Sequence, residues 1–252
     1  RPLLRADAGC ATTVDTLHAL YDSINFVMHP GEARALWMNA TVMLVKLDIV
    51  LCPSDVDSSP PGYGRVNYRF NVGATPIMSD RGNGAFVPFA SFRPADFRDG
   101  LSATVGLSER TKGDWVRDGP SPGNYSLLPY DGTFPVDPDV FRAACAGARP
   151  DVARDSRSGE SWFLTGFHFT SYNHCSTPNP RLIDCTIDGR GEDLHQLSLR
   201  DGVFSARSRH PGGVNCLLMD GSVRFVKDAV SLPTWRALST RSSGDVVSID
   251  DL

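Results

Sequence analysis

The sequence lacks two features that mark large classes of proteins. It has no run of about 20 apolar residues, the length that a membrane-spanning helix needs, and no segment typical of a signal peptide. It also lacks an excess of basic residues, because 25 lysines and arginines stand against 29 aspartates and glutamates and the formal net charge is −4. Nucleic-acid-binding surfaces are normally basic. We therefore expect no nucleic-acid partner.

Several motifs that carry catalysis are also missing. The sequence has no Cys-x₂-Cys pair, so we expect no zinc site, and it has no His-Glu-x-x-His motif. Gly62-Tyr63-Gly64 has no third glycine to form a dinucleotide-binding loop. The segment around Ser108 lacks the closing glycine of a nucleophile elbow. These absences favour a protein that is not an enzyme.

Turn-forming residues are abundant instead. The 252 residues include 23 glycines and 18 prolines, and 41% of the residues are hydrophobic. This composition is typical of a loop-rich protein with short strands and not of a helical bundle. There is no internal repeat and no linker of biased composition, so the sequence favours one globular α+β domain over residues 1–252.

Six cysteines are present, at positions 10, 52, 145, 175, 185 and 216. An even number in a chain of this composition is compatible with three disulfides and an exported location, although six cysteines allow 15 pairings and buried free thiols are the alternative. We expect at least one disulfide. The preferred pair is Cys175 and Cys185, because these residues flank the proline-rich loop 176–180.

Hydrophobic periodicity predicts short helices and strands in alternation with long loops. Asp137 is predicted to be the N-cap of a helix with Pro138 in its first turn. We expect Val140, Phe141 and Ala144 of this helix to face inward. Pro233 is expected to open another short helix. Segment 112–134 is interpreted as a long insertion. The predicted helices are 14–22, 31–45, 137–147 and 233–238, and the predicted strands are 49–51, 66–72, 85–89, 104–108, 161–170, 214–219, 222–226 and 246–249.

The clearest local signal is a β-hairpin near the C-terminus. Asp220-Gly221 lies between two strand-like segments, and this dipeptide is typical of a two-residue type I′ turn. His210 precedes Asp220 by ten residues, with Pro211-Gly212-Gly213 giving a sharp entry into the first strand. A strand of six residues is about 20 Å long, so we expect the two side chains not to meet. We expect Asp220 and Gly221 to serve the turn and His210 to hydrogen-bond a neighbouring loop.

Carboxylates elsewhere offer two weaker hypotheses. Asp55, Asp57 and Ser59 alternate as oxygen ligands do in calcium loops, but Pro60 and Val66 depart from the EF-hand pattern. An Asx-rich turn after Cys52 is the alternative interpretation. Asp99 and Glu109 lie at the two ends of one segment and could act as an acid/base pair only at a short separation. We expect both to be structural, and calcium is the one cofactor considered.

Taken in order, these segments resemble a planctomycete-type prepilin-like family of unknown function, named for its C-terminal His-(nine residues)-Asp-Gly domain. That domain corresponds here to residues 200–252, and Cys52-Pro53 and Asp99-Gly100 belong to further matching motifs. One departure is Asp99-Gly-Leu-Ser-Ala-Thr, where the family usually has Asp-Gly-Thr-Ser-Asn-Thr. The matching stretches are 20–26, 39–41, 51–55, 67–73, 99–109, 172–185, 208–225, 235–238 and 244–248.

The resemblance implies a pilin-like architecture, with a mostly antiparallel sheet, a few short helices and long loops. It also implies an N-terminal spine helix that is absent from this chain and would be its only contact with a membrane. We therefore expect an exported, non-enzymatic pilin- or pseudopilin-like protein at the cell surface, in the periplasm or outside the cell. Its expected partners are copies of itself or other envelope proteins. The alternative is a soluble extracytoplasmic module that binds a small molecule, a glycan or calcium.

Overall fold

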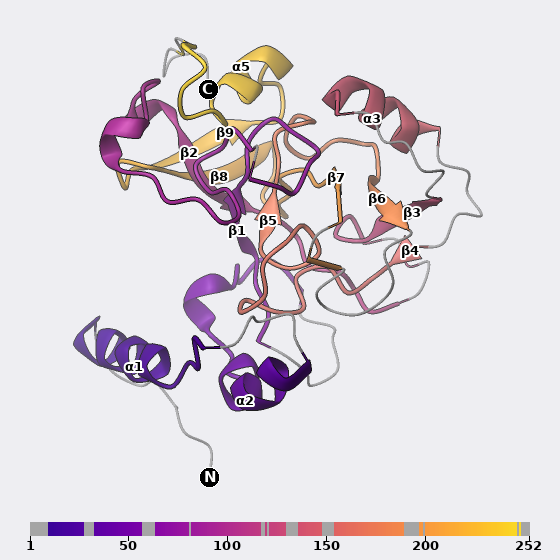
Figure 1. Ribbon diagram of the computed structural model, residues 1–252. Helices are drawn as coiled ribbons and strands as arrows, with labels where there is room; N and C mark the ends of the chain where they lie inside the picture. Colours follow the sequence, from indigo (N-terminus) through magenta and orange to yellow (C-terminus); the bar gives the residue numbers. More distant parts are fainter. Residues whose placement is uncertain are drawn as a thin grey trace.

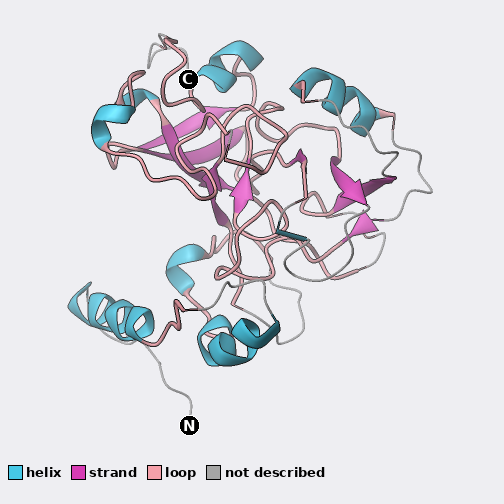
Figure 2. Cartoon of the chain, viewed as in Figure 1, coloured by secondary structure: helices cyan, strands magenta, loops and turns pink. Residues whose placement is uncertain are grey.

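The protein, described here from a computed structural model, has two β-sheets in its body and two helices that lie apart from them (Figure 1). Figure 2 shows how much of the chain between these elements is loop and turn. The structure describes residues 10–27, 33–56, 64–80, 82–116, 119, 121–129, 136–147, 154–188, 197–198, 200–245 and 247.

The first sheet has five strands in the order β5-β1-β2-β8-β9. Only β5 runs parallel to its neighbour, and the other pairs are antiparallel. Trp235 of α5 is fully buried against this sheet, in one core cluster with the strand residues Val105, Val214 and Val226. The elements are β1 (Tyr68–Asn71), β2 (Val105–Glu109), β5 (Ser171–Tyr172), β8 (Gly213–Leu218), β9 (Val223–Lys227) and α5 (Leu232–Ala237).

The second sheet has four strands in the order β4-β3-β6-β7, of which β3 and β6 are parallel. Phe141 and Cys145 of α3 pack with the buried side chains of Ile187 and Val203 on this sheet. The fold is therefore mixed α/β and mostly antiparallel, as predicted. The elements are β3 (Tyr125–Pro129), β4 (Arg154–Asp155), β6 (Asp184–Asp188), β7 (Gly202–Val203) and α3 (Pro138–Ala146).

Residues 10–27 and 33–50 form an N-terminal arm beside this body (Figure 1). The arm contains α1 (Cys10–Asp22), α2 (Ala33–Met43) and the short 3₁₀ helix η1 (Asp48–Val50). Its base is anchored, because Met43 is buried among Leu164, Phe169 and Leu197 of the body. The outer helix α1 is attached to α2 through Asn25, whose N–H donates to Asn39 Oδ1 at 2.8 Å.

The predictions that rest on local capping signals are confirmed. Asp137 caps α3 by accepting the N–H groups of Asp139 and Val140, and Ser231 caps α5 just before Pro233. The inward face of α3 is shifted from the prediction, however. Phe141 and Cys145 are buried, whereas Val140 is 54% exposed and Ala144 is exposed too.

Three predicted strands are wrong. Segment 49–51 overlaps η1, and segment 85–89 ends in a turn where Phe89 has a positive φ of 62°. Segment 161–170 is interrupted at Gly166, which has a φ of 109° and whose carbonyl accepts the N–H groups of the three residues 169–171. The predicted strand 246–249 lies, apart from Val247, outside the described residues. Strands β3 and β6 were not predicted.

The C-terminal hairpin forms, but with a different turn. Gly221 has a φ of 87° while Asp220 is not among the residues with positive φ, so the turn is not type I′. Instead the Gly221 N–H donates to Leu218 O at 3.0 Å and the Leu218 N–H donates to Ser222 O at 2.8 Å. This is the three-residue loop with a glycine bulge, the next most common hairpin connection.

The disulfide also differs from the expected one. Cys185 is bonded to Cys145 of α3, and Cys175 is a buried free thiol. The two bonded Cα atoms are 5.6 Å apart, and the bond joins positions 40 residues apart in the sequence. The reason is the packing of α3 on the second sheet, which faces Cys145 toward β6. That Cys175 and Cys185 flank a proline-rich loop therefore did not determine which cysteines pair.

A buried ion cluster joins the two sheets. Asp184, at the start of β6, accepts hydrogen bonds from Arg110 and Arg207, with Arg207 Nε 3.0 Å from Asp184 Oδ2. Ser205 Oγ donates to the same carboxylate at 2.8 Å. Burial alone would raise the pKa of Asp184, but the positive charges of Arg207 and Arg110 outweigh it and the pKa lies below its ordinary value.

We expect Asp184→Asn to lower the free energy of unfolding by about 3–5 kcal/mol at neutral pH, because two buried arginines lose their counter-charge. Stability from a carboxylate with a lowered pKa is present above its unfolded pKa, about 4, and is lost as the pH falls below it. The difference between variant and native protein should therefore shrink in acid. Urea unfolding at several pH values measures it.

The matched control is Asp48→Asn, whose side chain is 88% exposed and pairs with Lys46 at 3.3 Å. Exposed pairs contribute at most about 1 kcal/mol, so this change should have little effect at any pH. Equal losses for the two variants would contradict the role given to Asp184.

Candidate functional site

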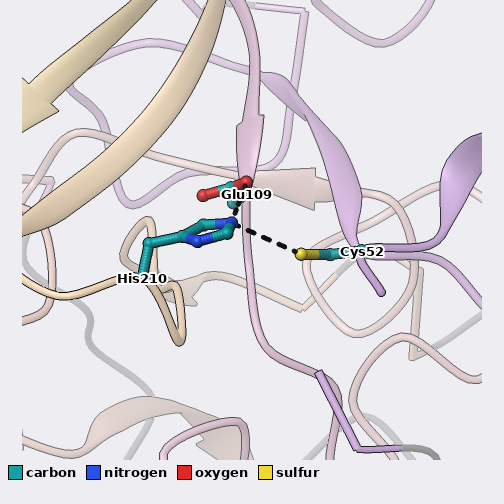
Figure 3. Close-up of side chains that lie close together, drawn as sticks. All are labelled: Cys52, Glu109 and His210. Atoms are coloured by element: carbon teal, nitrogen blue, oxygen red, sulfur yellow. Dashed lines mark hydrogen bonds and ion pairs between the residues drawn. The ribbon is translucent and has the colours of Figure 1, made fainter. Parts of the chain in front are cut away.

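Three chemically reactive side chains from distant parts of the chain converge beside the first sheet. They are Cys52, Glu109 and His210, and Figure 3 shows one ring nitrogen of His210 facing both the carboxylate and the thiol. The His210 Nε2 atom lies 3.4 Å from Glu109 Oε1 and 3.8 Å from Cys52 Sγ. The three potential ligand atoms all lie within 4.8 Å of one another. We call these three residues the Cys-Glu-His cluster.

Each member of the cluster is held by its own hydrogen bonds. The Cys52 N–H donates to Asn67 Oδ1 at 3.1 Å. Glu109 ends β2 and accepts two hydrogen bonds from Asn215 of β8, from the backbone N–H and from Nδ2, each at 3.0 Å. The His210 N–H donates to Ser208 Oγ at 3.1 Å. The cluster is therefore positioned by strand pairing and side-chain hydrogen bonds.

The cluster lies partly below the surface. Cys52 and Glu109 are buried, whereas the side chain of His210 is 35% exposed. Tyr68 on β1 lies close to Cys52 and Glu109. Burial raises the pKa of Tyr68, and the neighbouring Cys52 and Glu109 raise it further, so the phenol stays neutral.

Both nearby groups meet the same nitrogen of the imidazole, which limits the chemistry of the cluster. In a nucleophilic triad, the histidine uses one ring nitrogen for the nucleophile and the other for the carboxylate. Here Cys52 and Glu109 both approach Nε2. The geometry is that of groups directed at a common point, which suits an ion between them better than a proton relay.

The carboxylate of Asp55 lies next to the cluster and has other partners. Asp55 Oδ2 is 3.4 Å from Lys112 Nζ and accepts Asn67 Nδ2 at 2.8 Å, while Oδ1 is 3.3 Å from Arg209 Nε. Two cations already neutralise this carboxylate, which argues against the calcium site proposed from the sequence. The other two residues of that hypothesis, Asp57 and Ser59, lie outside the described residues.

The remaining residues singled out in the sequence occupy structural positions. Asp220 is exposed in the hairpin turn, and its hydrogen bonds from the side chain and the N–H of Ser222 lower its pKa. It lies at the opposite end of β8 from His210, as the strand length predicts. Pro211 and Gly212, with a φ of 85° at Gly212, make the entry into the strand. A side chain at Gly213 would come within 2.2 Å of Val226 O.

Asp99 serves a site of its own. Its carboxylate accepts the N–H groups of Ser243 and Gly244 at 2.8 and 2.7 Å, and the adjacent Gly100 has a φ of 100° just before the 3₁₀ helix η3 (Leu101–Ala103). Asp99 thus holds the C-terminal segment, whereas Glu109 lies at the far end of β2. The two carboxylates have different partners and do not form an acid/base pair.

Cys52, Glu109 and His210 each belong to a motif recognisable in the sequence, but nothing in the sequence joins them. Glu109 lies 57 positions after Cys52, and His210 lies 101 positions after Glu109. The contributions of Tyr68 and Asn215 were missed. A signal for Asn215 exists, because it alternates with the buried Val214 and Cys216 and so points to the other face of β8.

Comparison with known proteins identifies a family. Residues 18–232 match the model of a family described as a protein of unknown function, DUF1559. Among curated proteins and among solved structures, nothing matches this chain.

We expect His210→Ala to make Cys52 react faster with maleimide, because Cys52 is only 5% exposed and its sulfur lies 3.8 Å from the imidazole that the change removes. Labelling under native conditions, followed by peptide mass spectrometry, distinguishes Cys52 from the buried free thiols Cys175 and Cys216. Arg209→Ala is the control, since Arg209 contacts Asp55 and not the thiol. An unchanged labelling rate at Cys52 in His210→Ala would show that the imidazole does not shield it.

Proposed function

We propose that this chain, which belongs to the DUF1559 family of unknown function, is an exported, non-enzymatic, pilin-like surface or assembly protein. The observation that carries this proposal is the apolar surface of the N-terminal arm. Contiguous exposed apolar side chains mark sites of protein–protein contact.

The arm exposes large apolar side chains that the body leaves uncovered. Val27 is 93% exposed, and Tyr21 and Phe26 are each more than 60% exposed with their rings 5.1 Å apart. Met38 is exposed too and contacts the residue before Phe26, since Asn25 Nδ2 is 3.9 Å from its sulfur. Leu44 and Ile49, further along the arm, are exposed as well. We call these six residues the arm patch.

The partner that this patch fits best is a second copy of the chain. An uncharged apolar surface is complementary to itself, as a two-fold symmetric contact requires. Two opposite charges accompany the patch, because Lys46 and Asp48, which lie between Leu44 and Ile49 in the sequence, form an ion pair at 3.3 Å. In a two-fold arrangement, the lysine of one copy can face the aspartate of the other.

Export is supported by the disulfide between Cys145 and Cys185, since disulfides persist mainly in oxidising compartments. None of the helices in the described ranges is long and apolar enough to cross a membrane. The resemblance to prepilin-like proteins and the His-(nine residues)-Asp-Gly hairpin support the pilin-like part of the proposal. In this reading, the loops and sheets present a surface and the arm makes the contacts of assembly.

We expect the double variant Phe26→Ser and Ile49→Ser to weaken self-association by at least about tenfold, because central apolar contacts dominate interface energies. Sedimentation velocity over a concentration series measures the association of the native protein and the variant.

Val140→Ser is the matched control, because Val140 is 54% exposed on α3, away from the arm. It should associate as the native protein does. A native protein that stays monomeric at every concentration, or a variant that associates equally well, would remove self-assembly through the arm patch.

A second candidate function is favoured by a cleft in the body. The cleft has a volume of about 420 Å³, within the range of small-molecule sites. Its lining residues include Phe70, Phe86, Phe92, Phe97, Thr165 and Ser171. We propose as the alternative a soluble extracytoplasmic module that binds a small aromatic molecule in this cleft.

Indole is a suitable probe for the cleft, because it combines an aromatic face with one N–H donor. We expect calorimetric titration to show binding that Ala90→Trp abolishes, since Ala90 lies exposed on the lining and a bulky ring there would fill the cleft. Val140→Ser again serves as the control. Absence of any heat in the native protein would count against the binding module and would leave the assembly proposal untouched.

A further inference from the structure

We propose that Cys52, Glu109 and His210 form a binding site for a zinc ion, with the fourth position taken by water. The observation behind this proposal is the convergence of a sulfur, an oxygen and a nitrogen ligand on one point (Figure 3). Thiolate, imidazole and carboxylate are the three ligand types that zinc takes in proteins.

The separations of the ligand atoms fit a tetrahedral ion. Zinc bonds of about 2.0–2.3 Å at tetrahedral angles place ligand atoms about 3.3–3.7 Å apart. The observed separations are 3.4 Å between His210 Nε2 and Glu109 Oε1 and 3.8 Å between His210 Nε2 and Cys52 Sγ. Binding therefore requires only a small inward movement of the thiol and the carboxylate, whose ligand atoms lie within 4.8 Å of each other.

The groups around the cluster already have the arrangement of an outer ligand shell. Asn215 donates two hydrogen bonds to Glu109, and Asn67 accepts the N–H of Cys52. Such partners orient metal ligands and raise metal affinity.

The charge balance also favours a divalent cation. Glu109 is a buried carboxylate, and the cations Lys112 and Arg209 on this side of the molecule are paired with Asp55. When zinc binds, the thiol of Cys52 loses its proton to solvent and its sulfur donates an electron pair to the ion. Two anionic ligands, Cys52 and Glu109, then balance the two positive charges of zinc.

Three protein ligands leave the fourth position of a tetrahedral ion for water. Cys52 and Glu109 are buried, but the His210 side chain is 35% exposed, so the ion would lie just below the surface. Three protein ligands and a water are typical of zinc sites that keep an open position. The absence of a Cys-x₂-Cys pair therefore excludes only the sites built from paired cysteines, because here the ligands come from three separate segments.

Metal binding can be tested on the chain as it is, with its disulfide kept intact by omitting thiol reductants. After dialysis against EDTA and its removal, we expect titration with zinc to show one bound ion per chain and a rise in melting temperature. Titration with cobalt(II) should give a sulfur-to-cobalt charge-transfer absorption band, which reports a thiolate ligand directly.

The variants Cys52→Ser and His210→Gln should each weaken zinc affinity by more than about 100-fold, because even outer-shell partners are worth about 10–100-fold. Cys52→Ser should also lose the cobalt charge-transfer band. His210→Gln changes a half-exposed residue, so it keeps the test valid if Cys52→Ser fails to fold.

Cys216→Ala is the matched control, because burial raises the pKa of the Cys216 thiol to about 12 and keeps it protonated. It should bind zinc and give the cobalt band as the native protein does. Failure of the native protein to bind zinc, or zinc binding that survives in Cys52→Ser and His210→Gln, would overturn the proposal.

Discussion

The buried carboxylate of Asp184 is the constraint on which the positions of the other elements depend. It accepts hydrogen bonds from Arg110, which follows β2 of the first sheet, and from Arg207, which precedes β8. Asp184 itself begins β6 of the second sheet. An ion cluster of this kind has few acceptable geometries, because each buried charge needs its partner in place. The two sheets are therefore joined at one defined point.

This ion cluster also determines where the Cys-Glu-His cluster forms. Glu109 and Arg110 are neighbours at the end of a strand, so their side chains point to opposite sides. With Arg110 directed at Asp184, Glu109 faces the opposite way, toward His210. The Arg207 N–H donates to Glu109 O at 2.8 Å, which fixes the segment leading to His210, and the Arg110 N–H donates to Asn67 O at 2.8 Å. Asn67 in turn holds Cys52.

Local signals predicted the parts of the fold that local chemistry determines. The cap at Asp137, the helix after Ser231 and the hairpin around Gly221 depend on residues a few positions apart. The parallel pairing of β3 with β6, the Cys145–Cys185 disulfide and the Cys-Glu-His cluster depend on contacts across tens of residues. Hydrophobic periodicity carries no information about such pairings, and so the disulfide was assigned to the nearer cysteine.

The N-terminal arm and the Cys-Glu-His cluster meet at one short segment, which relates the two proposals. Ile49 is the last residue of the arm patch, and Cys52 follows it after two residues. Between them the Asn67 N–H donates to Val50 O at 2.9 Å, which ties this segment to the start of β1. An ion bound by Cys52, Glu109 and His210 would add a further tie, from the segment after the arm to β2 and to the start of the hairpin. Because a patch presents a defined surface only if its base is fixed, metal binding at Cys52 would favour assembly through the arm without belonging to the interface itself.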